Sequence, residues 1–163
     1  MNNDGDSRTE VLTGRESDGG TWRVLAWQER DDDLMTTLHY ERGSARSAGG
    51  FGGPALHGAD AVNYAYGTST NCPPNVVART APGVTSVIAV LASGREVPLC
   101  ISPVVARFGL RFAAAILPVN DPLAGMRAVS ENGTEWSTEN RVPLPDTVGG
   151  SGHGWQSGGA SAL

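Results

Sequence analysis

The chain has 163 residues, in which 12 arginines stand against 17 aspartates and glutamates, giving a formal net charge of −5 and a pI near 5.1. This length fits one domain that can bury a core without disulfide staples. The acidic balance argues against nucleic acid or an anionic membrane surface as a partner, because both attract clustered positive charge. No segment approaches the roughly 18 apolar residues of a membrane span, and residues 1–10 lack the features of a signal peptide. We therefore expect a cytoplasmic protein with no membrane insertion.

The first part of the chain begins with a polar leader, residues 1–10, and continues with one clear hairpin. The runs 21–27 and 34–40 are rich in β-branched and aromatic residues and flank a charged turn. They predict two antiparallel strands. Residues 41–60 follow as a stretch rich in Gly, Ser, Ala and Arg without periodicity. We expect a long loop there that is either mobile or functional.

The rest of the chain alternates apolar runs with turn signals. Further strands are expected at 62–66, 76–79, 84–91, 97–101, 110–117, 126–130 and 134–137. Pro98 has no N–H to donate, so its strand should lie at a sheet edge or contain a bulge. Asn132-Gly133 is a strong hairpin turn signal between the last two runs.

This pattern predicts an all-β fold, an antiparallel β-sandwich with about eight or nine strands. Residues 11–141 would form the sandwich domain. The leader 1–10 and a tail at 142–163, rich in Gly, Ser and Pro, are expected to be flexible or disordered.

The order of these pieces resembles that of small, uncharacterised β-sandwich proteins of actinobacteria. The matching pieces are TWRVLAW at 21–27, Tyr66-Gly67, the 84–97 unit with its Ser93-Gly94 turn, RFAAAILP at 111–118 and the hairpin at 126–135. The resemblance spans roughly residues 10–136. It implies an immunoglobulin-like sandwich from a high-GC bacterium, and it assigns neither a catalytic residue nor a ligand to this chain.

The two cysteines allow two interpretations. Cys72 lies in a stiff Asn-Cys-Pro-Pro segment, and alternation along 97–101 puts Cys100 on the face away from Val97, Leu99 and Ile101. A bridge between them would stabilise the fold by roughly 3–4 kcal/mol in the chain-entropy model. In a reducing cytoplasm, two free thiols are the alternative.

Metal chemistry has one candidate set among the histidines. His57 and Asp60 could offer two ligands from one loop, and His39 could join them from its strand. Acidic residues at the tip of the first hairpin, Asp31, Asp32 and Asp33, could contribute oxygens to calcium. Scattered polar histidines and a solvated turn are the simpler interpretations, so we expect no cofactor, with zinc or calcium as the alternatives.

Two aromatic residues stand out as candidate partner contacts. Phe51 is the only large apolar side chain between Gly43 and Pro54, and Trp155 is the only tryptophan, tyrosine or phenylalanine of the glycine-rich tail. Trp22 and Trp27 fall on opposite faces of one strand, so one should be buried and the other can be exposed.

These features together favour a non-catalytic binding or protein-interaction module that meets an unknown protein partner or associates with itself. One alternative is a metal-dependent hydrolase using His57, Asp60 and His39. Another is a structural subunit of a bacterial assembly.

Overall fold

The computed structural model describes residues 7–56, 61–139 and 154–162, and these residues form strands and turns without any helix. All strand pairs are antiparallel. The thirteen strands are β1 (Thr9–Arg15), β2 (Thr21–Arg30), β3 (Asp33–Arg42), β4 (Ala45–Phe51), β5 (Val62–Ser69), β6 (Cys72–Thr80), β7 (Val84–Leu91), β8 (Glu96–Pro98), β9 (Cys100–Ile101), β10 (Arg111–Ile116), β11 (Leu123–Ser130), β12 (Glu135–Glu139) and β13 (Gly154–Ala162). The prediction of an antiparallel β-sandwich is confirmed, with more strands than the eight or nine expected.

The first four strands form a four-stranded sheet, here called the N-terminal sheet, in the order β1-β2-β3-β4. Consecutive strands pair because only short turns separate them, as in a meander. Alternation along β2 and β3 sends Trp22, Val24, Leu38 and Tyr40 into a buried cluster. Ala26 and Leu34 of the same two strands enter a second buried cluster, and Thr36 is buried as well.

The other nine strands form one sheet in the order β8-β7-β11-β12-β13-β5-β6-β10-β9. Its two end strands, β8 and β9, are separated in the chain only by Leu99. The Leu99 N–H donates to the Val87 carbonyl at 2.9 Å, so the sheet must fold back until its two ends meet. Pro98 lies in the end strand β8, which confirms the expected edge position.

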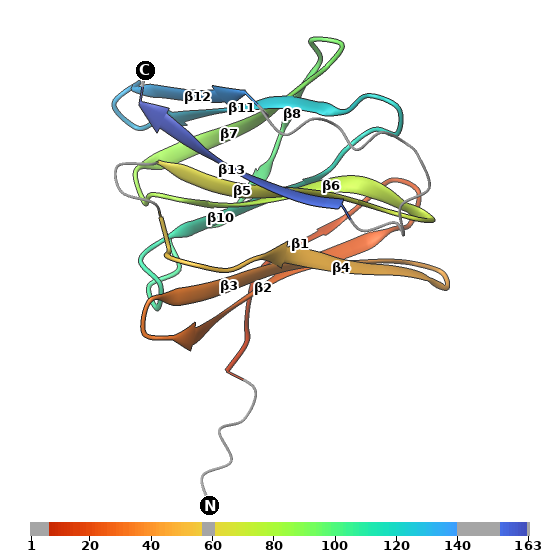
Figure 1. Cartoon of the computed structure of the whole chain (residues 1–163), viewed down its shortest axis with the longest axis horizontal. Coiled ribbons are helices and arrows are strands. Elements are labelled where there is room, and N and C mark those ends of the chain that lie inside the picture. The colour runs from red at the N-terminus through yellow and green to blue at the C-terminus, as the bar shows by residue number, and fades with distance from the viewer. Residues whose placement is uncertain (1–6, 57–60, 140–153, 163) are drawn as a thin grey trace, which may run out of the picture.

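The result is three stacked layers, visible in Figure 1, with the N-terminal sheet below, β5, β6 and β10 in the middle, and β7, β8, β11 and β12 above. The middle layer is buried on both faces. Its upper face, with Tyr64, Val76 and Ala113, joins the core shared with the upper layer. Its lower face, with Ala65, Val77 and Ala114, packs on the N-terminal sheet.

A buried arginine lies between the N-terminal sheet and the middle layer. Arg79 of β6 is 0% exposed, donates from Nη1 to the Leu34 carbonyl at 2.7 Å, and places its guanidinium 4.1 Å from the centre of the Phe51 ring. Its Nε has no hydrogen-bond partner, and no described carboxylate pairs with it. Burial lowers the pKa of Arg79 to about 10, so the group keeps its charge at neutral pH.

Two segments differ from the sequence-based expectation. Residues within the expected loop 41–60 form β4, which pairs with β3 from Thr36↔Phe51 to Arg42↔Ala45. Part of the expected flexible tail forms β13. Both strands consist largely of small residues with little apolar periodicity. They form because neighbouring strands offer unpaired backbone N–H and C=O groups, and the sequence of a segment does not show whether such a neighbour exists. The rest of the tail and residues 1–6 of the leader lie outside the described residues.

The contact between Arg79 and Phe51 should be measurable as a coupling energy. A double-mutant cycle with Arg79→Met and Phe51→Leu, followed by urea unfolding, should give a coupling of about 1–2 kcal/mol, because a desolvated cation–π contact has that strength. Arg79→Met keeps a long apolar stem and removes the unpaired charge. A coupling below about 0.3 kcal/mol, within the additivity error of such cycles, would contradict this role.

Candidate functional site

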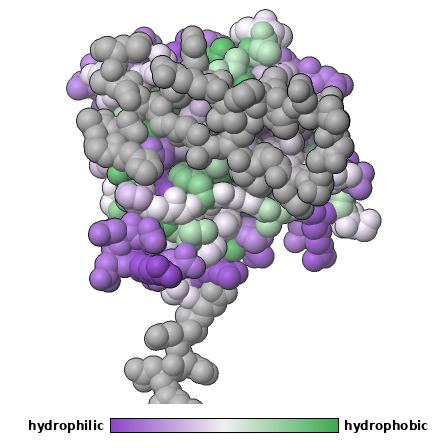
Figure 2. Space-filling view, in the orientation of Figure 1, coloured by the Kyte–Doolittle hydropathy of each residue, from purple (hydrophilic) through white to green (hydrophobic). Residues whose placement is uncertain are grey.

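The outer face of the N-terminal sheet brings together charged residues from three strands. Cross-strand register aligns Thr13 of β1, Arg23 of β2 and His39 of β3 in one row. The next row on the same face holds Arg15, Thr21 and Glu41. Figure 2 shows hydrophilic residues gathered along the lower part of the molecule, where this sheet lies, with only small hydrophobic areas between them.

A hollow of about 460 Å³ opens on this face. We call it the groove, and it is lined by Glu10, Thr13, Gly14, Arg15, Thr21, Trp22, Arg23, His39 and Glu41. Gly14 is required here, because a Cβ at this position would collide with the indole of Trp22. The indole of Trp22 is buried on the inner face of the sheet, behind the strand that carries Arg23.

Four exposed charged side chains line the groove, Glu10, Arg15, Arg23 and Glu41. Within the described part of the chain, none of the four forms an ion pair with another residue. Two positive and two negative side chains therefore line one hollow without pairing with each other. All four can form ion pairs with a bound ligand.

His39 lies on the groove wall, half buried, with its Nε2 3.0 Å from the Thr37 hydroxyl. Its pKa is lowered below the usual value of 6.5, first by burial and then by the positive charges of Arg23 and Arg8. Both causes disfavour the imidazolium, so His39 is neutral at physiological pH.

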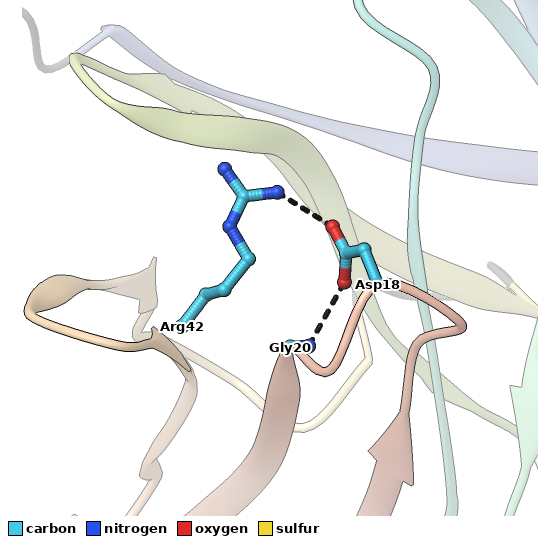
Figure 3. Close-up of polar contacts among 3 residues, drawn as sticks. All are labelled: Asp18, Gly20 and Arg42. Carbon is cyan, nitrogen blue, oxygen red and sulfur yellow. Dashed lines mark hydrogen bonds and ion pairs between the residues drawn. The ribbon is translucent and has the colours of Figure 1, made fainter.

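One rim of the groove is fixed by the turn that joins β1 to β2 (Figure 3). The Asp18 carboxylate accepts the Gly20 N–H at 2.8 Å and the Arg42 Nη1 at 2.6 Å, which ties this turn to the end of β3. These two hydrogen bonds, the one from Gly20 first, lower the pKa of Asp18. Nearby, the Trp22 indole N–H donates to Glu16 at 3.0 Å.

On the same face of the sheet, beyond the groove, lies an aromatic surface. Trp27 is half buried and Arg8 places its guanidinium 4.7 Å from the centre of its ring. Trp22 is buried on the opposite face of the same strand. The predicted split between these two tryptophans is therefore confirmed.

The candidate metal ligands are not brought together by the described structure. His57 and Asp60 lie outside the described residues. His39 is near two arginines, whose charges disfavour a cation beside it. The described residues, including the Asp31–Asp33 tip, contain no group of three or more side chains placed to hold a metal ion.

The two cysteines are free thiols, Cys72 half buried at the start of β6 and Cys100 exposed in β9. Strand β10 lies between β6 and β9, and two strand spacings already amount to about 9.6 Å. A disulfide requires Cα atoms within about 7 Å. This geometry favours the free-thiol alternative, and the exposed position of Cys100 agrees with the predicted face.

The two aromatic candidates for partner contact are both engaged within the chain. Phe51 points inwards, packs on the cluster around Trp22 and meets Arg79. The backbone of Trp155 pairs with Gly67 in β13. Their role in partner binding stays a prediction.

No family model, curated protein or solved structure matches this chain. The resemblance to actinobacterial sandwich proteins therefore stays a prediction. Among the described residues there is no helix long and apolar enough to span a membrane.

Sequence reasoning identified His39 but missed the charged residues around it. The usable signal was the alternation of Arg23 with Trp22 and Val24, and of Glu41 with Tyr40, which places the charged residues on one outer face. The contribution of β1 could not be found in this way, because a register shift between Glu10 and Leu12 interrupts its alternation.

The pKa of His39 should respond to its arginine neighbour. Replacing Arg23 by Gln removes one repulsive charge and should raise the pKa of His39 part of the way towards 6.5, since burial remains. Because the folded pKa is lowered, neutral His39 stabilises the fold above about pH 6.5, and this stabilisation is lost as the pH falls through the folded pKa. NMR titration of the imidazole measures the shift.

Arg95→Gln is the matched control, since Arg95 is exposed in the turn between β7 and β8. This variant should leave the His39 titration unchanged. An unchanged titration in Arg23→Gln as well would show that Arg23 does not act on the imidazole.

The thiols should differ in reactivity. Under non-reducing conditions the unfolded chain should react with two equivalents of a thiol reagent, because both cysteines are free. In the folded protein exposed Cys100 should react before half-buried Cys72, which Cys100→Ser and Cys72→Ser variants would assign. A chain with no titratable thiol after purification would contradict the free pair.

Proposed function

We propose that the protein is a non-catalytic binding module that holds a short peptide segment of mixed charge in the groove of its N-terminal sheet. The observation that supports this most is a set of four charges around one hollow, none of which forms an ion pair with another residue that the structure describes: Glu10, Arg15, Arg23 and Glu41. The charges of a ligand that binds there would be paired by groups already held on a rigid sheet.

The presence of both positive and negative side chains in the groove favours a ligand that carries both charges. A purely acidic peptide would gain at Arg15 and Arg23 and be repelled at Glu10 and Glu41, and a purely basic peptide would meet the reverse. A segment with both carboxylates and cations can satisfy both pairs, and such complementarity sets specificity more than affinity. A peptide also fits the aromatic surface at Trp27, where an amphipathic ring offers contact area.

The arrangement around His39 supports binding over catalysis. The Thr37 hydroxyl and the His39 imidazole are 3.0 Å apart, as a nucleophile and its base would be. A catalytic base is in turn oriented by a third group, usually a carboxylate. No carboxylate hydrogen bond to His39 occurs in the described ranges.

The other functions raised by the sequence remain predictions. A metal-dependent hydrolase would need His57 and Asp60 to join His39, and metal analysis of the purified protein distinguishes it. A structural role in a bacterial assembly, an immunoglobulin-like relationship and an actinobacterial origin are expectations from composition and resemblance.

Three decapeptides test the groove: one of alternating Glu and Lys, one rich in Glu and one rich in Lys. We expect the alternating peptide alone to shift the His39 imidazole signals saturably. Arg23→Gln and Glu41→Gln should each weaken its binding about two- to fivefold, since one exposed charge contact contributes up to about 1 kcal/mol. The imidazole signals must be followed at a pH where His39 is neutral.

Arg95→Gln again serves as the control for the loss of one arginine, and it should bind like the unchanged chain. If no peptide shifts His39, or if the groove variants bind as tightly as the control, the proposal is wrong. Tighter binding of the Glu-rich or Lys-rich peptide would exclude the mixed-charge class.

A further inference from the structure

Strand β13 occupies a position between two strands that belong to different layers. It pairs with β5 of the middle layer and with β12 of the upper layer, and so joins them into one sheet. Figure 1 shows β13 running along β5 and ending beside β12. The space between β5 and β12, which we call the strand slot, is therefore shaped for an added strand.

The attachment of β13 is uneven. Seven residue pairs link it to β5, from Gly154↔Thr68 to Ala160↔Val62, and only two pairs, Trp136↔Ala162 and Ser137↔Ser161, link it to β12. Its hold on the sheet therefore depends mainly on backbone hydrogen bonds to one neighbour.

The sequence of β13, GWQSGGASA, is poor for a strand. Gly158 and Gly159 lie in its middle, opposite Tyr64 and Asn63. Glycine inside a strand costs roughly 0.5–1 kcal/mol relative to alanine, and β-branched residues are better still. A strand with better residues at these two positions would occupy the slot more stably.

The chain segment that leads from β12 to β13 is long. Antiparallel strands can be joined by a two-residue turn. Here fourteen residues, 140–153, connect β12 to β13. The covalent link therefore gives β13 an effective concentration at β12 on the order of millimolar, which a free peptide can match.

The strand that receives β13 favours an uncharged partner. Residues from Val62 to Gly67 in β5 are all buried, and β5 carries no charged residue. A charge at the centre of an added strand would lose water without gaining a counter-charge. β13 itself has no charged residue.

From these observations we propose that the strand slot is an acceptor site for an extended, uncharged segment of a partner protein, rich in β-branched residues, which displaces β13 and pairs antiparallel with β5. This mode of recognition obtains affinity from main-chain hydrogen bonds and specificity from alternate side chains. It uses different residues from the groove and does not depend on the proposed groove ligand.

Three labelled nonapeptides test the slot: GWQSGGASA, the improved GWQSTVASA and the control GWQPTVASA. Replacing the two central glycines should tighten binding about five- to thirtyfold, which corresponds to about 1–2 kcal/mol. The control should not bind, because proline removes a ladder hydrogen bond in mid-strand. Fluorescence anisotropy with the full chain measures all three.

A full-length Ser157→Pro variant weakens the chain's own β13 and should bind the improved peptide at least about tenfold more tightly than the unchanged chain. Arg23→Gln, in the groove, should leave this binding unchanged. Equal binding of the proline control, or equal affinity in Ser157→Pro and the unchanged chain, would overturn the proposal.

Hydrogen exchange of the unchanged chain gives a second readout that needs no variant. At saturating improved peptide, the amides of β13 should exchange faster while those of β5 stay protected. Unchanged protection of β13 at saturation would also overturn the proposal. If Ser157→Pro forms dimers and loses peptide binding on doing so, the occupant is a second copy and the partner class is wrong.

Discussion

The double-sided burial of the middle layer is the constraint on which the rest of the fold depends. Strands β5, β6 and β10 must present apolar or uncharged side chains on both faces, because each face meets another layer. Arg79 is the fully buried exception, since Arg111 at the start of β10 is only half buried. The charge of Arg79 costs several kcal/mol to bury. The Phe51 ring and the Leu34 carbonyl offset part of that cost, so both layers must keep their register around this one side chain.

The same constraint determines where charge can appear. The middle layer has no face in contact with solvent, so it cannot carry a charged binding surface. The outer face of the N-terminal sheet can, because its strands hold charged side chains in fixed positions. The groove lies there. Its wall residues come from β1, β2 and β3, which successive turns hold in register, and the contacts of Asp18 with Gly20 and Arg42 fix one rim. The groove is therefore built by paired strands and not by loops.

Much of this architecture could be predicted from the chain, and the missing parts share one physical reason. Strands such as β2, β3, β7 and β10 have alternating β-branched or aromatic residues, or continuous apolar runs, and the sequence alone predicts them. Strands β4 and β13 are made of small residues and form because neighbours offer unpaired backbone groups, which is a tertiary effect. The candidate site was found only at His39, because Glu10, Arg15, Arg23 and Glu41 become neighbours through cross-strand register.

The placement of β13 has a consequence for biosynthesis. The four strands of the N-terminal sheet pair in chain order, so their contacts are local and can form early on the ribosome. Strand β5 emerges far ahead of β13, and about ninety residues separate their first residues. During that interval the nascent chain holds β5 without its later neighbour, and an exposed apolar edge of this kind is a target for chaperones.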